Sequence, residues 1–277
     1  MGPVGKALWH MESHLTTAIT LGEIAAASGL SRFDLSRTFG SATGHTVMGY
    51  LRRRRLSEAA RALSEGAPDI LTVALDAAYG SHEAFSRAFR EQFGLTPEQV
   101  RSQGHLDNIR YLEPIKMDES LLTDLEAPRV EDCRDLLIAG LSGRFTFATN
   151  QGIPALWQRF IPYLGSIPGQ VEGASYGVCS NGDDAGGFDY TCGVEVTEAP
   201  DLPGDLACIR IPARRYLVFT HRGHISTISS TVYTIWNKYL PETGQESACA
   251  PDFERYDARF DPVSGSGEVE IWVPIKN

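Results

Sequence analysis

Residues 21–44 carry the pattern of two short helices separated by a tight turn (LGEIAAASGLSRFDLSRTFGSATG). Gly29 stands where the chain must turn, because glycine accepts the positive φ that such turns need. Ser31 can then cap a second helix, in which Leu35 and Phe39 are apolar and four residues apart. The apolar positions on one face of the first helix are Leu21, Ile24 and Ala25. The pattern predicts a helix-turn-helix, whose second helix is built to lie in the major groove of DNA.

This pattern occurs twice in the chain. The segment SRTF at 36–39 returns as SRAF at 86–89, and Gly44 returns as Gly94, each at an offset of fifty residues. One such pattern is a weak indication, because an αα-hairpin in any helical domain looks similar. Two copies at a fixed offset are much stronger. The sequence therefore predicts an all-α N-terminal domain with two helix-turn-helix units.

Two further features connect these units to a known family. Residues 47–63 have the apolar spacing of a long helix between the two units, and residues 93–101 read FGLTPEQVR. Together they resemble the DNA-binding domain of AraC/XylS-type transcription regulators, in which a central helix joins two helix-turn-helix units before an FG-x-T/S-P-x-x-x-R signature. The resemblance covers residues 1–107. It implies double-stranded DNA as a partner and allows RNA polymerase as another.

The outward face of the second helix in each unit is the expected DNA-reading surface. Arginine suits this role because its forked donors match guanine or phosphate, although each arginine could equally be a solvated charge. Glu83 could accept from cytosine, or could simply complement a helix N-terminus. The candidate DNA-binding residues are Arg32, Phe33, Ser36, Arg37, Ser81, His82, Glu83 and Arg87.

Two other features of this half need a structural assignment. Residues 52–55 are four successive arginines, which point around the whole helix, so at most two can face one partner. A run of this kind is usually a solvated face, but here it lies between two groove readers, and we expect at least one phosphate contact. Trp9, in the first expected helix, is predicted to lie in the core.

The charge of the chain is unevenly distributed. Residues 1–110 hold 12 Lys/Arg and 11 Asp/Glu, whereas the remaining 167 residues hold 13 basic and 24 acidic side chains. The two halves are therefore expected to face different partners. Because the first half is barely basic, local clustering has to supply its attraction to DNA.

Composition limits the other classes of function. The five cysteines are odd in number and form no CxxC pair, which favours reduced thiols and a cytoplasmic protein without a metal site. No apolar run is long enough for a membrane span, and the N-terminus lacks the pattern of a secretory signal. We expect no cofactor, no membrane partner and no catalytic residues.

Beyond an expected linker at 108–120, the pattern changes to alternating strands and helices. Strands are predicted around 137–147, 175–179 and 188–196, with a helix at 153–164. The same order returns as strands around 208–220, 253–260 and 268–274, with a helix at 225–239. Residues 121–277 therefore read as an α+β domain of duplicated β-α-β-β units.

This half resembles the GyrI-like small-molecule-binding domain. The motifs that carry the resemblance are IPARRY at 211–216, FERY at 253–256 and VEIWVPI at 269–275. The order of the two domains resembles Rob-type regulators. The resemblance implies a cleft that takes drug-like, often cationic molecules, with Glu254 of FERY at its base.

Elementary physics agrees with a cationic ligand. A carboxylate in an aromatic pocket is costly to desolvate when the pocket is empty, and a bound cation offsets that cost. Aromatic faces attract cations as well. The candidate ligand-binding residues are Glu254, Trp157, Tyr176, Tyr190, Tyr233 and Trp236. Ordinary core packing is the alternative for the aromatic residues, and a surface salt bridge is the alternative for Glu254. Glu270 could be a second pocket carboxylate, but a solvent-facing charge is slightly favoured because it alternates with Val269 and Ile271.

The sequence thus predicts a ligand-responsive, sequence-specific DNA-binding transcription regulator. Two alternatives stay open for the second domain. It could hydrolyse electrophilic compounds, with Glu254 and Tyr176 or Tyr190 positioning water. It could also bind a protein partner and have no pocket. The absence of a recognisable triad, metal cluster or phosphate loop from the sequence argues against an enzyme.

Overall fold

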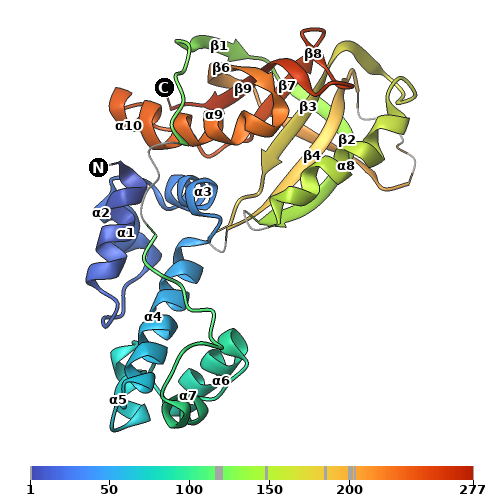
Figure 1. Cartoon of the computed structure of the whole chain (residues 1–277). Helices are drawn as coiled ribbons and strands as arrows, with labels where there is room; N and C mark the ends of the chain where they lie inside the picture. The colour runs from blue at the N-terminus through green and yellow to red at the C-terminus, as the bar shows by residue number, and fades with distance from the viewer. Residues whose placement is uncertain are drawn as a thin grey trace. The chain divides into compact units, whose positions relative to one another are not determined.

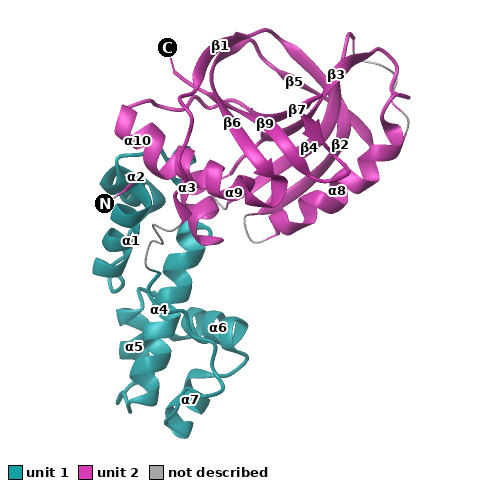
Figure 2. Ribbon diagram, turned by 45° about the horizontal axis from the view of Figure 1, so that its top comes forward, with its two compact units in different colours: residues 1, 3–35, 45–117 teal, residues 2, 36–44, 118–277 magenta. Residues whose placement is uncertain are grey.

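The computed structural model describes residues 2–115, 121–146, 149–183, 186–198, 202 and 204–276. The chain divides into two compact units, of residues 1, 3–35 and 45–117 and of residues 2, 36–44 and 118–277 (Figure 2). Helix α3 is therefore shared between them. Of the linker expected at 108–120, residues 116–120 lie outside the described residues, and residues 108–115 belong to the first unit.

The described part of the N-terminal half is entirely helical, as predicted (Figure 1). Its helices are α1 (Pro3–Ser13), α2 (Leu21–Ser28), α3 (Arg32–Thr43), α4 (Val47–Ser64), α5 (Ile70–Asp76), α6 (His82–Phe93) and α7 (Pro97–Gln103). The pairs α2–α3 and α5–α6 are the two predicted helix-turn-helix units. Helix α4 is the predicted central helix.

Local capping explains where these helices begin and end. Thr20 and Glu23 form a capping box at the start of α2, and Gly29 ends that helix with a φ of 78°. In the second helix-turn-helix, the Ser81 side chain accepts a hydrogen bond from the backbone of α6, and Gly94 ends α6 with a φ of 72°. These polar and glycine signals are local, which is why the sequence predicts both turns correctly.

The expectation for Trp9 is wrong. Its side chain is 64% exposed, because the face of α1 that packs inward is the one carrying Val4, Ala7, Leu8 and Met11. Trp9 does not lie on that face. Its large aromatic side chain suggested burial, but its position on the helix leaves it exposed.

The described C-terminal half holds one antiparallel sheet with helices, which confirms the predicted α+β class. Its strands are β1 (Arg129–Cys133), β2 (Leu136–Thr146), β3 (Gln170–Ser180), β4 (Gly187–Val196), β5 (Leu206–Ile211), β6 (Arg214–His224), β7 (Asp252–Asp257), β8 (Phe260–Asp261) and β9 (Ser266–Pro274). Its helical segments are the 3₁₀ turns at 150–152, 161–163 and 225–227, the α-helices α8 (Ile153–Phe160), α9 (Ile228–Thr234) and α10 (Leu240–Thr243), and a π-helical stretch at 235–239. The expected strand residue Phe147 lies outside the described residues.

The strand order shows the predicted duplication. Along the sheet it is β1-β6-β9-β7-β3-β4-β2-β5, with β8 beside β9. Each half gives one β-α-β-β unit, β2-α8-β3-β4 and β6-α9-β7-β9, and the halves join where β3 pairs with β7. Strand β1 was not predicted, whereas β5 and β6 together occupy the strand region expected around 208–220. Strand β1 pairs with β6, and β5 pairs with β2, so each pairs into the opposite half.

The sheet curls on itself. Strand β1 is first in the order and β2 is seventh, yet only residues 134–135 connect them. The three Cα–Cα steps from Cys133 to Leu136 span at most about 11 Å, so the sheet has to bend until these strands come close. Its inner face is apolar and includes Ile138, Val178, Val218 and Phe253. Its outer face packs against α8 and against α9 with the stretch that follows it.

Candidate functional site

In the second helix-turn-helix unit, α6 presents the side chains that were expected to face DNA. Phe85 and Phe89 are fully buried, which turns Glu83 and Arg87 outward, where both are exposed. Ser81 holds the N-terminus of α6, and His82 Nε2 lies 3.6 Å from a carboxylate oxygen of Glu98. The predicted DNA-reading face of α6 is thus exposed to solvent on the first compact unit.

The first helix-turn-helix, formed by α2 and α3, differs from the second along α3. Arg32 is exposed and Phe33 is half-buried, but Ser36 is only 7% exposed. Arg37, which belongs to the second unit with Ser36, forms an ion pair with Asp252. The exposure expected of Ser36 and Arg37 is therefore not seen, because their surroundings bury them. Their contact with DNA stays a prediction.

The arginine run at 52–55 separates into distinct roles. Arg54 is 2% exposed, forms a two-pronged ion pair with Glu12 at 2.9 Å for both contacts, and donates to Glu58 at 2.8 Å. Arg52 pairs with Glu91, and Arg55 donates to two backbone carbonyls. Arg53 is exposed, and among the described residues it has no carboxylate partner. It is therefore the arginine of the run best suited to phosphate.

On the second unit, Glu254 forms a compact cluster on the outer face of the sheet. The hydroxyls of Tyr190 and Tyr256 both donate to Glu254 Oε2, at 2.7 and 2.8 Å. The indole of Trp157, on α8, donates to the Tyr190 hydroxyl at 3.1 Å and packs edge-on against the ring of Tyr256. Both tyrosine hydrogen bonds end on Oε2, and within the described residues none reaches Glu254 Oε1, which keeps its capacity to accept from a bound group.

Gly177 makes this close approach possible. It lies opposite Glu254 on the neighbouring strand β3. A Cβ at this position would lie 2.0 Å from the Tyr190 hydroxyl and 2.7 Å from Glu254 Oε2. Any side chain here would have to displace the hydroxyl from the carboxylate, so the glycine is part of the site.

Burial controls the electrostatics of the cluster. It raises the pKa of the Glu254 carboxyl, and the two tyrosine hydroxyls offset part of that rise because they favour the ionised form. Burial beside Glu254 also holds the pKa of both phenols well above the ordinary value, so they act as donors. The site therefore holds a carboxylate that a bound cation would stabilise.

The structure brings some of the predicted ligand residues together and separates others. Glu254, Trp157 and Tyr190 meet as described. Tyr233 and Trp236 are buried in or beside α9. Tyr176 lies on the inner face of the sheet and does not reach the cluster, because its neighbour Gly177 takes the outward position.

Sequence reasoning missed two members of the cluster, Tyr256 and Gly177. Tyr256 follows Glu254 by two residues in one strand, so the period-2 rule could have placed both on one face. Gly177 lies in the segment YGV at 176–178, but a single sequence gives no sign that its missing Cβ faces another side chain.

Glu270 is neither a pocket carboxylate beside Glu254 nor a solvent-facing charge. It is 3% exposed on the inner face and is bound by the guanidinium groups of Arg129, Arg255 and Arg259. The slight preference for a solvated charge was wrong, because alternation away from an apolar face leads here into the interior of a curled sheet.

Other kinds of site were sought over the same residues. In the parts of the chain that the structure describes, no three His, Cys, Asp or Glu side chains group in a way that suits a metal ion. Among those residues no helix combines the length and the apolar composition needed to cross a bilayer. All five cysteines are free thiols.

Fold and site together define a two-part protein, with a pair of helix-turn-helix units followed by a curled sheet that presents a half-buried glutamate among aromatic residues. The model of the GyrI-like small molecule binding domain matches residues 126–276, and a helix-turn-helix domain model matches residues 24–103. The chain belongs to the GyrI-like family, and both predicted resemblances are confirmed.

Individual relatives match either the whole chain or part of it. The chain is 25% identical over 287 residues to the transcriptional regulator Rob of Salmonella typhimurium, covering 99% of this chain and 98% of that protein. It is 36% identical over 133 residues to the transcriptional regulator BrlR of Pseudomonas aeruginosa, covering 47% of this chain and 49% of BrlR. It is 30% identical over 105 residues to the multiple antibiotic resistance protein MarA of Escherichia coli, covering 38% of this chain and 83% of MarA.

Proposed function

We propose that the chain is a DNA-binding transcription regulator whose second unit binds an aromatic organic cation at Glu254. The observation that carries this proposal is the Glu254 cluster, in which a carboxylate of raised pKa lies against Trp157 and two tyrosines. The similarity to Rob, over nearly the full length of both chains, supports the regulatory role.

The DNA-binding part rests on two helix-turn-helix units in one chain. Two reading helices could meet successive major-groove segments on one side of a duplex, so a single copy of the chain would suffice. We propose that Arg32, Phe33, Ser36 and Arg37 of α3, and Ser81, His82, Glu83 and Arg87 of α6, provide these contacts. Contact with RNA polymerase and a cytoplasmic location are further elements of this proposal.

The ligand-binding part rests on the balance of charge at Glu254. The carboxylate has two donors on Oε2, and an aromatic wall from Trp157 and Tyr256 stands beside it. A flat cation could place its charge near Oε1 and its rings against that wall, gaining about 0.5–2 kcal/mol per cation–π contact. Tyr233, in α9, and Trp236, in the stretch that follows it, are not part of this cluster, and we propose that a ligand extending beyond it contacts them.

Substitution of Glu254 tests this assignment. Glu254→Gln keeps the shape and removes the charge, so the affinity for rhodamine 6G, a flat aromatic cation, should fall by at least about tenfold, the equivalent of one charge-assisted hydrogen bond. Binding to a DNA duplex should stay within the error of the wild-type value. Fluorescence anisotropy measures both affinities on the intact chain.

Glu198→Gln is the matched control, because Glu198 is an exposed carboxylate of the same unit that lies just after β4, away from the Glu254 cluster. It should change neither affinity. Equal rhodamine binding by wild type and Glu254→Gln would remove Glu254 from the ligand site. Recovery of chemically unchanged dye is also expected, since we propose binding without turnover, and steady conversion of the dye would favour the hydrolase alternative.

A further inference from the structure

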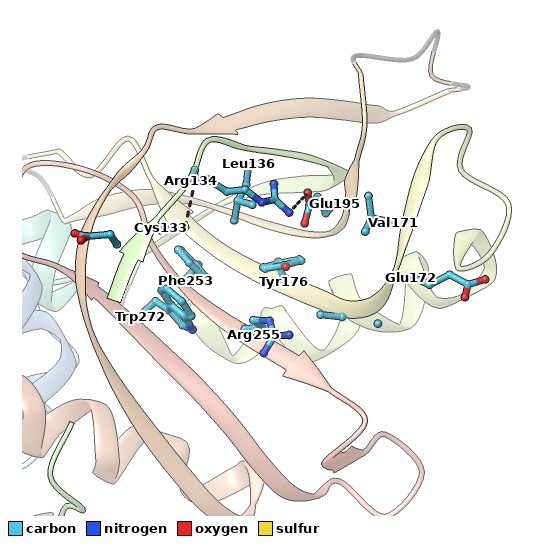
Figure 3. Close-up of a pocket in the computed structure, with 13 residues that line it drawn as sticks. Cys133, Arg134, Leu136, Val171, Glu172, Tyr176, Glu195, Phe253, Arg255 and Trp272 are labelled. Atoms are coloured by element: carbon cyan, nitrogen blue, oxygen red, sulfur yellow. Dashed lines mark hydrogen bonds and ion pairs between the residues drawn. The ribbon is translucent and has the colours of Figure 1, made fainter. Parts of the chain in front are cut away.

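The curled sheet has a second concave site, on the face opposite Glu254. A cavity of about 540 Å³ opens beside the short turn between β1 and β2 (Figure 3). Along β7 the side chains of Phe253 and Arg255 line it, whereas Glu254 between them points to the outer face. The mouth of a curled or closed sheet is a common place for a small-molecule site.

Aromatic side chains form one wall of this cavity. The rings of Phe253 and Trp272 stack with centroids 5.1 Å apart and an angle of 18° between their planes. Tyr176 adjoins Phe253 at a centroid distance of 6.0 Å. These three residues come from three adjacent strands, β3, β7 and β9, so they form a continuous surface on which a flat molecule could lie.

A buried carboxylate lies across from this wall. Glu195, near the end of β4, is only 8% exposed, and Arg134 binds it at 2.6 Å. Among the described residues this is the one ion pair that Glu195 makes. Arg134 lies in the two-residue turn between β1 and β2, and its side chain is 67% exposed. Glu270, by contrast, is held by three arginines. The charge on Glu195 is thus balanced by one exposed side chain, which can exchange its ion pair for contacts with water.

The remaining charges of the cavity favour a cation over an anion. Its lining includes the carboxylates of Asp132, Glu172 and Glu195 and the guanidinium groups of Arg134 and Arg255. Arg255 is already bound to Asp257 at 2.8 Å and to Glu270 at 3.2 Å. Asp132 is likewise bound to Arg215 at 2.9 Å, so Glu172 and Glu195 face Arg134 alone. An entering anion would meet these two carboxylates and would have to take Arg134 from Glu195. An entering cation has only to replace Arg134.

We propose that this mouth is a second small-molecule site, which binds a planar organic cation of the amidinium or guanidinium type. The cationic group takes the place of the Arg134 guanidinium on Glu195, and the flat body lies against Tyr176 and Phe253. Arg134 acts as an internal competitor that neutralises Glu195 while the site is empty. The site shares no residue with the Glu254 cluster, so it does not depend on the function proposed for that cluster.

Benzamidine and benzoate provide a matched pair of probes, because they have almost the same shape and opposite charge. On the intact chain, benzamidine should bind and shift the indole N–H resonance of Trp272, assigned with Trp272→Phe, while benzoate should not. Glu195→Gln should weaken benzamidine binding by at least about tenfold. Arg134→Ala removes the competitor and should tighten it by about three- to fivefold, the amount expected for one exposed ion pair.

Because benzamidine is an aromatic cation that the Glu254 cluster could also bind, its affinity is taken from the Trp272 resonance, which reports on this cavity. Glu254→Gln is the control and should leave that affinity unchanged, while Glu195→Gln should leave rhodamine 6G affinity unchanged. Thermal denaturation verifies that each variant is folded, and the double variant Arg134→Ala, Glu195→Gln excludes an effect of an unpaired arginine. Stronger binding of benzoate than of benzamidine would overturn the proposal. So would equal benzamidine affinity of wild type and Glu195→Gln, or no binding by either wild type or Arg134→Ala.

Discussion

At the scale of single residues, one carboxylate oxygen organises the outer-face cluster. Glu254 Oε2 accepts from two tyrosine hydroxyls, and this geometry exists because Gly177 has no side chain to block it. Burial raises the pKa of Glu254, so its ionised form is disfavoured in the folded chain. Its contribution to the free energy of unfolding is therefore largest at low pH and falls as pH rises from the ordinary carboxyl pKa to the raised one.

Gly177→Ala should disrupt the cluster. The new Cβ would lie 2.0 Å from the Tyr190 hydroxyl, so Tyr190 has to move away from Glu254. We expect a loss of about 1–3 kcal/mol in the free energy of unfolding, as for other overpacked positions, and weaker binding of rhodamine 6G. Urea denaturation and dye titration measure the two effects.

Gly80→Ala is the matched control, because a Cβ at Gly80 meets no heavy atom of the described chain within 4 Å. It should change stability by less than about 0.5 kcal/mol, as for an ordinary surface substitution. If Gly177→Ala behaved like this control, the tight packing at Gly177 would not be present in solution.

At the scale of elements, helix α4 uses neighbouring arginines for different purposes. Arg54 is buried and joins Glu12, Glu58 and the backbone carbonyl of Leu112, whereas Arg53, one position earlier, is exposed. The helical period of 100° per residue separates them, since adjacent positions point in different directions. The run RRRR is thus partly a structural feature and partly a charged surface.

Arg54→Ala should cost about 1.5–3 kcal/mol in the free energy of unfolding, because it removes the charge-assisted hydrogen bonds of a buried guanidinium to the half-buried carboxylates of Glu12 and Glu58. Arg53→Ala should cost less than about 0.5 kcal/mol. The adjacent position makes Arg53 a close control for helix propensity. Comparable losses in urea denaturation would contradict the assignment of Arg54 as the buried member of the run.

Elements also show what a sequence can and cannot predict here. The helix-turn-helix turns were predicted correctly, since Gly29, Ser81 and Gly94 give local signals that do not depend on the rest of the fold. The pairing of β1 with β6 and of β5 with β2 joins residues that are 65 to 89 positions apart, and nothing local marks it. The curl that follows from this pairing is why Glu270 was misjudged and why the cavity beside Glu195 was not predicted.

At the scale of the whole molecule, the division of charge sets the conditions for DNA binding. The chain carries a net charge of −10, most of it beyond residue 110, so the chain as a whole repels DNA. Affinity therefore has to come from a few arginines on the first unit, among which Arg53 and Arg87 are exposed. Such binding is driven by counterion release and should weaken as salt rises.

Arg53→Ala should reduce the slope of log affinity against log salt concentration by about one, as expected for the loss of one phosphate contact. Arg87→Ala should instead relax base preference in sites selected from a random duplex library. Anisotropy titrations at a series of KCl concentrations measure the slopes. An unchanged slope for Arg53→Ala would show that this arginine does not contact phosphate.

The most direct test of the central claim is calorimetric titration of the intact chain with rhodamine 6G in two buffers of different ionisation enthalpy, over a range of pH. A bound cation stabilises the ionised form of Glu254 and lowers its raised pKa. We predict that binding releases up to about one proton at pH values between the lowered pKa of Glu254 in the complex and its raised pKa in the free protein. The affinity should rise with pH through this range. Glu254→Gln should abolish both effects. Binding without proton release, or release that persists in Glu254→Gln, would contradict the assignment of Glu254 as the counter-charge of the ligand.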